Sequence, residues 1–307
     1  MRKLLIILIL LVTNDGLSQQ NAQFSQWVWN PMALNPAHAG IKNCSELKVL
    51  SRLQWLGFQG APWSSTVLYS NNLETNRKKV YSPRHGIGFK LLNDNFGPIT
   101  TNNLALNYAF HLNFTQDNRL SVGISGGLRQ FIFNSSQLTT LHPDPVLKRS
   151  TTQYTPLVGM GLWWNTKNYY IGLSFEELSS TDWKDVGQAS GFRLHWMLTS
   201  GVKFQLTDDF TLIPNLLLKK TINSPLTLDL CTTLDLYSMF KVGVGFRNQD
   251  AFVGLFQVKL PKGVVFGYSC DYVFSDIQRV SMFSHEVSLM YSNCSSVDKS
   301  RLACPLF

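Results

Sequence analysis

Charged residues are scarce in this sequence. Asp, Glu, Lys and Arg make up 15% of the 307 residues, against roughly 25% in a typical soluble protein. After the first residues, no stretch approaches the roughly 18 apolar residues that a transmembrane helix needs. The length suits two ordinary domains or one large β-barrel. A chain with so little charge and no such helix must hide its apolar residues in another way, and an outer-membrane β-barrel does so.

The sequence also lacks the common motifs of catalytic and metal sites. Its 6 histidines are dispersed, without the HxH or HExxH spacing that favours a metal. There is no GxSxG nucleophile motif and no P-loop. We therefore expect no metal, no cofactor and no enzyme activity. A remote alternative is an outer-membrane enzyme whose serine and histidine are brought together only by the fold.

The cysteines are not arranged as a metal site. They are 5 in number and form no CxxC pair. Disulfides form in an oxidising cell envelope, and Cys294 and Cys304 are the best candidate pair because both lie in the C-terminal tail. The alternative is that all the cysteines are free and act as small apolar side chains.

The first residues have the pattern of a secretory signal peptide. Arg2 and Lys3 form a short basic region, and Leu4 to Val12 is an apolar run that is too short to span a bilayer. Small residues stand at the −3 and −1 positions of a cut after Ser18. We predict that residues 1–18 are a signal peptide, with an uncleaved anchor as the alternative.

Apolar and polar residues alternate along most of the remaining chain. The clearest stretch is "SPLTLDLCTTLDLY", residues 224–237. Successive side chains of a strand point to opposite faces, so one face here is leucine-rich and the other carries Thr, Asp and Cys. A helix would mix the two sets. Apolar residues on one face with small and polar residues on the other are typical of lipid-facing barrel strands.

The same alternation predicts fourteen strands, an even number as bacterial single-chain barrels prefer. We therefore predict an all-β fold, a single antiparallel transmembrane β-barrel of the outer-membrane type. The expected strands are 46–58, 62–72, 84–94, 101–113, 118–133, 155–165, 168–175, 191–206, 210–219, 225–237, 239–249, 251–260, 263–274 and 282–291.

The connections between these strands differ in length. Outer-membrane barrels have short periplasmic turns and longer extracellular loops, so we expect the two kinds to separate to opposite ends. The short turns are 115–118, 165–168, 207–209 and 248–250, and the long connections are 71–83, 134–154, 176–190 and 275–281.

Several charged residues fall on the predicted inward faces. The formal net charge is +8, but the basic residues are scattered, which favours lumen lining or contact with anionic head groups over nucleic acid. Opposite charges across a lumen can pair and close it; alternatively they line a channel or a docking surface for a polypeptide. The candidate lumen charges are Arg52, Lys90, Arg129, Arg193, Asp229, Asp235, Asp271 and Glu286.

The segment "QFSQWVWNPMALNPAHAG", residues 23–40, precedes the first strand. Its two Asn-Pro steps favour extended or turn geometry and disfavour a helix. We expect an extended strap that packs in the lumen or against the periplasmic rim, starts on the periplasmic side and contacts a partner; an ordinary first strand with its turn is the alternative. The candidate strap residues are Phe24, Trp27, Trp29, Asn30, Pro31, Asn35 and Pro36.

This segment also resembles the N-terminal signature of the PorP/SprF family of type IX secretion system membrane proteins. The resemblance continues in order along the chain, with two departures: His38 stands where an aromatic residue is commoner, and Trp63 where a polar one often stands. The matching blocks are "SRLQWLGFQGAPWSSTV" at 51–67, "HGIGFKLLNDNFGPITTNNLALNYAFHL" at 85–112, "HPDPVL" at 142–147, "SHEVSLMY" at 284–291 and "CPLF" at 304–307.

The resemblance implies a component of the type IX secretion machinery of Bacteroidota in the cell outer membrane. It implies secretion or surface anchoring of a cargo such as a large adhesin, with the cargo's C-terminal domain, other secretion components and outer-membrane lipid as partners. A porin-like transporter of small solutes is the rival. The expected division is a signal peptide at 1–18, a strap at 19–45, a barrel at 46–291 and a tail at 292–307.

Overall fold

The computed structural model describes most of the chain after the predicted signal peptide. The expected C-terminal tail falls almost wholly outside the described residues, as does the "HPDPVL" block. The described ranges are 22–42, 44–57, 60–73, 83–115, 117–137, 150–183, 191–222 and 224–293.

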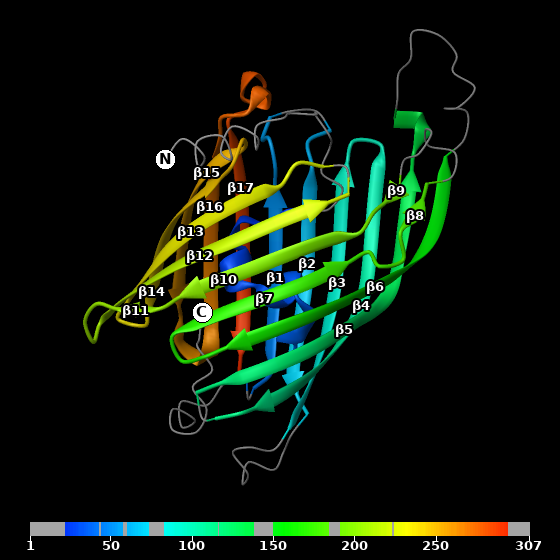
Figure 1. The fold of residues 1–307 in the computed structure, drawn as a ribbon. Helices are drawn as coiled ribbons and strands as arrows, with labels where there is room; N and C mark the ends of the chain where they lie inside the picture. The colour runs from blue at the N-terminus through cyan, green and yellow to red at the C-terminus, as the bar shows by residue number, and fades with distance from the viewer. Residues whose placement is uncertain are drawn as a thin grey trace, which may run out of the picture.

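Fourteen strands of the described chain close into one antiparallel barrel (Figure 1). Neighbours in the sequence are neighbours in the sheet, and the first strand pairs with the last, which leaves no open edge. The strands are β1 (Glu46–Leu53), β2 (Trp63–Asn72), β3 (Arg84–Phe96), β4 (Ile99–Asn113), β5 (Arg119–Phe133), β6 (Thr151–Asn165), β7 (Tyr169–Glu176), β10 (His195–Val202), β12 (Phe210–Thr221), β13 (Thr227–Leu236), β14 (Phe240–Arg247), β15 (Ala251–Lys259), β16 (Val264–Val273) and β17 (Phe283–Ser292).

The alternation of side chains explains why these segments are strands of a membrane barrel. In β13, Leu230 is 46% exposed on the outer face, while Asp229 and Cys231 beside it are 3% and 4% exposed. The outer face is thus apolar and suited to lipid, and the inner face is polar, as in outer-membrane barrels. No helix in the described ranges has the length and apolar character needed to cross a membrane.

The predicted fold class is confirmed, and most strand bounds agree within a few residues. The expected strand 46–58 ends early, at Leu53, because Trp55 adopts a positive φ of 51° and the chain turns. The expected strand 191–206 is divided into β9 (Gly191–Phe192), β10 and β11 (Phe204–Gln205). β9 pairs with β8 (Thr181–Asp182), an extra hairpin that the alternation did not predict.

The separation of long and short connections is only partial, so that expectation was wrong. Since consecutive strands alternate in direction, the connections 54–62, 134–150, 177–194 and 274–282 share one end, which we call the loop end; Figure 1 shows β8 and β9 there. The turn at 248–250 lies at this end too, although it is short. The connection 73–83 lies at the opposite end, the turn end, although it is long. Connection length therefore does not alternate strictly along the chain.

A charge on the lipid-facing side should test the placement of the membrane. Leu106, the central residue of β4, is 64% exposed. Leu106→Arg is expected to lower the free energy of unfolding by about 2–4 kcal/mol, because an arginine at the bilayer midplane is poorly solvated. Urea titration of the barrel in lipid vesicles, followed by the mobility of unheated samples on gels, measures this. Leu106→Phe is the control, and equal stability of both variants would contradict a lipid-facing position.

Candidate functional site: a plugged lumen

Residues 22–42 lie inside the barrel, and we call this segment the plug. It forms three short helical elements, η1 (Ser25–Trp29), α2 (Pro31–Leu34) and η2 (Pro36–His38); Figure 1 shows it in blue behind β10 and β12. The expectation of an extended strap was therefore wrong. Pro31 and Pro36 each occupy the first position of a helix, where the missing N–H has no intrahelical partner to lose and the fixed φ suits the helix.

The first part of the plug packs its aromatic residues against one side of the lumen. Trp27 and Trp29 are 5% and 6% exposed and contact a cluster that includes Met197, Leu217 and Val253 from β10, β12 and β15. Phe24, which is partly buried, packs instead against the cluster of Met32, Ala39, Leu50, Leu68 and Ala109 on the opposite side. The plug therefore reaches both walls of the barrel.

The asparagines that precede the prolines hold the middle of the plug. Asn35 donates from Nδ2 to the carbonyl oxygens of Leu162 at 2.9 Å and Leu173 at 3.2 Å. Its Oδ1 accepts from the backbone N–H of Ala37 at 2.9 Å and so caps η2. Asn30 donates to the carbonyl of Gln26 at 2.8 Å. These side chains supply the partners that a buried irregular backbone needs.

The last part of the plug is bound at the turn end. His111 of β4 contacts the carbonyl of Ala39 at 2.9 Å, and the guanidinium of Arg119, the first residue of β5, donates to the carbonyl of Ile41 at 2.6 Å. His38 packs edge-on against Trp163 with 5.1 Å between ring centroids. His38 thus takes the packing role of an aromatic residue at the position where the family more often has one.

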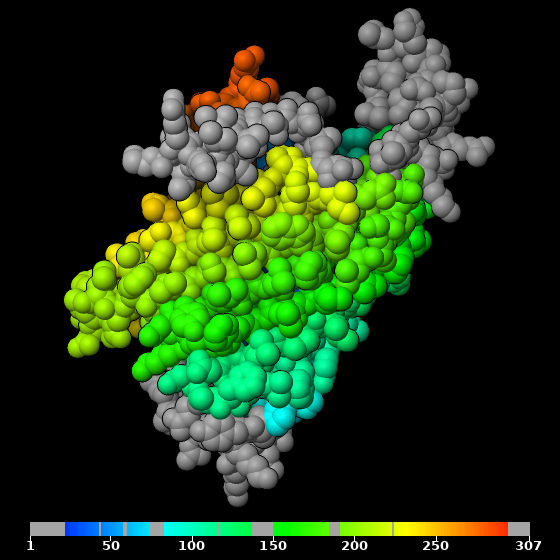
Figure 2. Space-filling model, viewed as in Figure 1, coloured from blue at the N-terminus to red at the C-terminus, as the bar shows by residue number. Residues whose placement is uncertain are grey.

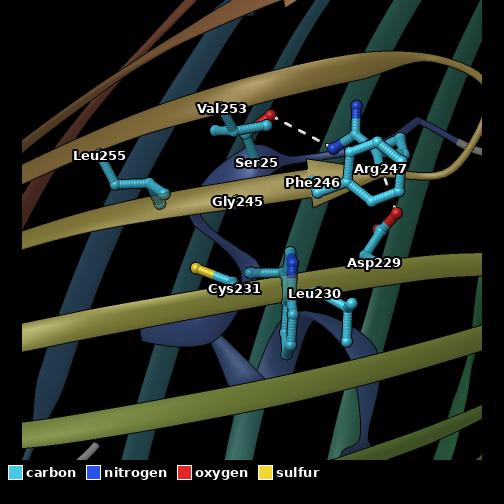
Figure 3. A pocket seen from close by; sticks show the side chains of 10 residues that line it. Ser25, Asp229, Leu230, Cys231, Gly245, Phe246, Arg247, Val253 and Leu255 are labelled. Carbon is cyan, nitrogen blue, oxygen red and sulfur yellow. Dashed lines mark hydrogen bonds and ion pairs between the residues drawn. The ribbon is translucent and has the colours of Figure 1, made fainter.

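A buried network of charges holds the start of the plug, with Ser25 at its centre. The Ser25 hydroxyl donates to Asp271 Oδ2 at 2.7 Å and accepts from Arg52 at 2.6 Å and Arg247 at 3.3 Å. Figure 3 shows Arg247 between Ser25 and Asp229, with which it also pairs at 3.3 Å. Four elements, η1, β1, β14 and β16, are thereby joined at one hydroxyl, and Arg247 adds β13.

Glu286 of β17 binds the plug backbone directly. Its carboxylate accepts from the backbone N–H of Ser25 at 2.7 Å and from that of Gln26 at 3.1 Å, and it pairs with Arg52 at 3.4 Å. Glu286 and Asp271 are both 0% exposed. Loss of these donors would leave a buried carboxylate without hydrogen bonds, which is strongly destabilising. The plug therefore supplies hydrogen-bond donors that Glu286 in the barrel wall requires.

The remaining predicted lumen charges have different surroundings. Lys90 bridges the Ala33 carbonyl and Glu176, each at 2.9 Å, and Arg129 pairs with Glu177 beneath the ring of Phe192. Farther toward the turn end, Asp235 pairs with Lys241 at 3.5 Å. Arg193 is not in a strand of the barrel: it follows β9, pairs with Asp182 of β8 at 2.6 Å and is 31% exposed. The structure therefore brings Arg52, Asp229, Asp271 and Glu286 into one network and leaves the others apart.

Sequence reasoning did not single out Ser25 or Glu177. Ser25 is a small polar residue among aromatic ones and has no motif of its own. Glu177 follows a strand and has a positive φ of 61°, so the period of two could not place it.

The plug has a defined direction along the barrel. Arg52 lies next to the last residue of β1, and Asp271 lies near the end of β16, so Ser25 is close to the loop end. Arg119, which binds Ile41, begins β5 at the turn end. The plug therefore runs from the loop end to the turn end. These contacts do not identify the periplasmic end, so which end of the plug faces the periplasm stays a prediction.

Two small pockets lie beside the plug. The pocket beside Ser25 and Arg247 has a volume of about 10 Å³, and the pocket beside His38 and Lys48 has the same volume. Each holds about one water molecule. In Figure 2 the strands between the grey regions form a continuous wall on the visible face. Among the described residues, no three His, Cys, Asp or Glu side chains are grouped so as to hold a metal ion.

Three of the cysteines are in the described ranges. Cys231 and Cys270 are free, and Cys44, which follows the plug, is disulfide-bonded. The alternative in which all the thiols are free is therefore wrong. The predicted pair Cys294–Cys304 lies outside the described residues.

Comparison with known proteins gives a family and a fold. A model of the family "Type IX secretion system membrane protein PorP/SprF" matches residues 16–291. The crystal structure of the toluene transporter TbuX of Ralstonia pickettii is similar with a TM-score of 0.53 and 10% identity, over 86% of this chain and 93% of that chain. The outer membrane protein Omp33 of Acinetobacter baumannii gives 0.48 and 8%, over 82% and 99%. No curated protein sequence matches the chain significantly.

The fit between plug and wall can be tested at a glycine of β5. A Cβ atom on Gly123 would lie 2.2 Å from the backbone nitrogen of Ala37, whereas one on Gly126 would meet no atom within 4 Å. Gly123→Ala should therefore displace η2 and lower the free energy of unfolding by about 1–3 kcal/mol, with faster hydrogen exchange in residues 35–41. Gly126→Ala on the same strand is the matched control. Unchanged exchange in Gly123→Ala would show that the plug does not pack there.

Proposed function

Since this chain belongs to the PorP/SprF family of type IX secretion system membrane proteins, we propose that it is a closed outer-membrane platform for cargo. It supports the secretion or the surface anchoring of a cargo such as a large adhesin. The barrel is the membrane anchor, and its loops or its periplasmic rim hold the C-terminal domain of the cargo without covalent chemistry. The protein is a β-barrel component of the secretion system in the outer membrane.

The observation that carries this proposal is the filled lumen. Moving the plug out would expose Trp27 and Trp29, and each large apolar side chain returned to water costs roughly 1.5–3 kcal/mol. It would also remove the two backbone donors from buried Glu286, at a further cost. A resting state with a wide water-filled pore is therefore disfavoured, and a surface that binds another protein suits a closed barrel better.

In this proposal the plug residues affect the binding of the partner without contacting it. Trp27 and Trp29 are almost fully buried, so a cargo cannot contact them while the plug is in place. Their contacts with β10, β12 and β15 instead stiffen the wall that carries the connections at the loop end. A rigid wall presents its loops to a partner at a lower entropic cost of binding.

Single-channel recording distinguishes the platform from a porin-like transporter of small solutes. The intact protein in planar bilayers is expected to give no large, stable currents, because the plug blocks the lumen. The double variant Trp27→Ala/Trp29→Ala should conduct more often, because the plug loses its main apolar contacts. Leu106→Phe, on the outer face, is the control and should behave as the wild type. Large open-channel currents from the intact protein would favour the transporter instead.

Comparison of secreted and surface proteomes tests the cargo role. Deletion of the gene should deplete a cargo from the surface or the medium, and the wild-type gene should restore it. Trp27→Ala/Trp29→Ala should insert into the outer membrane but display several-fold less cargo, because the wall is less rigid. Normal insertion with unchanged display would limit the plug to packing. Unchanged proteomes after deletion would contradict the platform itself.

A further inference from the structure

The two ends of the lumen differ in how their charges are compensated. Toward the loop end, each of the following cations has a carboxylate oxygen within 3.5 Å. The pairs are Arg52–Asp271 at 2.7 Å, Lys90–Glu176 at 2.9 Å, Lys219–Asp229 at 3.0 Å, Arg247–Asp229 at 3.3 Å, and Arg129–Glu177. In the described part of the chain, each of these lumenal cations thus has a carboxylate partner.

The turn end of the lumen has an excess of cations instead. Among the described residues, two inward-facing carboxylates pair there, Glu46 with Lys42 at 2.7 Å and Asp235 with Lys241 at 3.5 Å. No ion pair is formed there by Lys48, Arg119 or Lys203 within the described ranges. Lys48 and the buried Arg119 donate instead to the carbonyl oxygens of the plug residues Trp29 and Ile41. Lys48 shares Glu46 with Lys42 as an electrostatic neighbour, so the cations at this end still outnumber the two carboxylates among the described residues.

Strand alternation shows that the lysines face the lumen and not the lipid. Lys48 stands between Leu47 and Val49, which are 42% and 43% exposed on the outer face. Lys203 likewise follows Val202, which is 39% exposed on that face. Lys203 and Lys42 are also electrostatic neighbours of Lys241, so these ammonium groups from the plug, β14 and the end of β10 converge on one mouth.

The rim around this mouth does not cancel the excess. The described turns at this end carry Lys167, Lys259 and Lys262, and against them Asp117, Asp208 and Asp209. Within the described residues these rim charges balance, so the lumenal cations supply the excess positive charge there. Positive charges that line a concave surface with low-dielectric walls strengthen the local electrostatic potential and attract anions.

We infer that the turn-end mouth of the lumen, lined by Lys42, Lys48, Lys203 and Lys241, binds an acidic polypeptide segment of a partner. We expect this end to be periplasmic, because most of the short turns lie there and the short turns of outer-membrane barrels face the periplasm. A polypeptide fits better than a lipid head group, because the cations point into the barrel while the outer face beside them is apolar. The plug closes the lumen above, so the segment docks in the mouth and does not pass through. This inference goes beyond the proposed function and holds for any cargo.

Binding of a short fluorescein-labelled polyglutamate peptide tests the inference. The full-length protein is placed in phosphatidylcholine nanodiscs, in which both mouths are accessible, and fluorescence anisotropy gives the Kd. Binding is expected at about 0.05 M salt and should be lost near 0.5 M, because screening shortens the range of the charges. Lys203→Glu should raise the Kd by about fivefold or more, the factor that one charge contact of about 1 kcal/mol supplies.

The matched control makes the same change of charge at the other end. Arg279 in η6 (Asp276–Arg279) is exposed at the loop end, so Arg279→Glu should leave the Kd unchanged. An equal effect of both variants would show that binding depends only on the net charge of the protein, and would overturn the inference. Absence of binding by the folded wild type would overturn it too. Loss of binding when phosphatidylglycerol is added to the nanodiscs would assign the mouth to lipid head groups and also overturn it. None of these readouts depends on cargo display, so failure here and failure of the platform proposal are distinguishable.

Discussion

The bond between Glu286 and the plug backbone is the interaction on which the rest of the lumen depends. Glu286 is fully buried, and two of its donors are main-chain N–H groups of Ser25 and Gln26. A buried carboxylate is tolerated only when it is paired and hydrogen-bonded. The wall therefore requires the plug, and the plug in turn obtains partners for backbone groups that its short helices leave unpaired. Neither part is electrostatically complete without the other.

The strands have to satisfy two environments at once. Their outer residues face lipid and need only be apolar, whereas their inner residues have to match the shape of one particular segment. The close approach of Gly123 to Ala37 and of Gly161 to Asn35 shows how little tolerance the inner face has. This asymmetry favours a closed platform, because a wall shaped to one internal segment gains nothing as a wide pore. It also leaves the loop end and the turn-end mouth as the surfaces available to partners.

The period of two in the sequence determined the barrel. In β13, leucine alternates with Thr and Asp, a pattern that fits a strand with lipid on one face and a polar interior on the other. The order of the strands in the sheet followed from the short connections between them. The same period placed Arg52, Asp229, Asp271 and Glu286 on inward faces, since the face of a residue in a strand depends only on its position. Arg193 was misplaced because it lies after a break in the strand, where the period no longer applies.

The tertiary structure alone decided what those inward residues meet. The Asn-Pro steps of the plug constrained its backbone, but only the barrel selected short helices over an extended strap, because the wall offers partners such as the Leu162 and Leu173 carbonyls to Asn35. The central role of Ser25 depends on side chains that are more than 200 residues away in the chain, such as Asp271 and Arg247. The direction of the plug likewise follows from which end of each strand it contacts. A sequence specifies the face of a strand through local geometry, but contacts across a closed lumen exist only after the last strand has paired with the first.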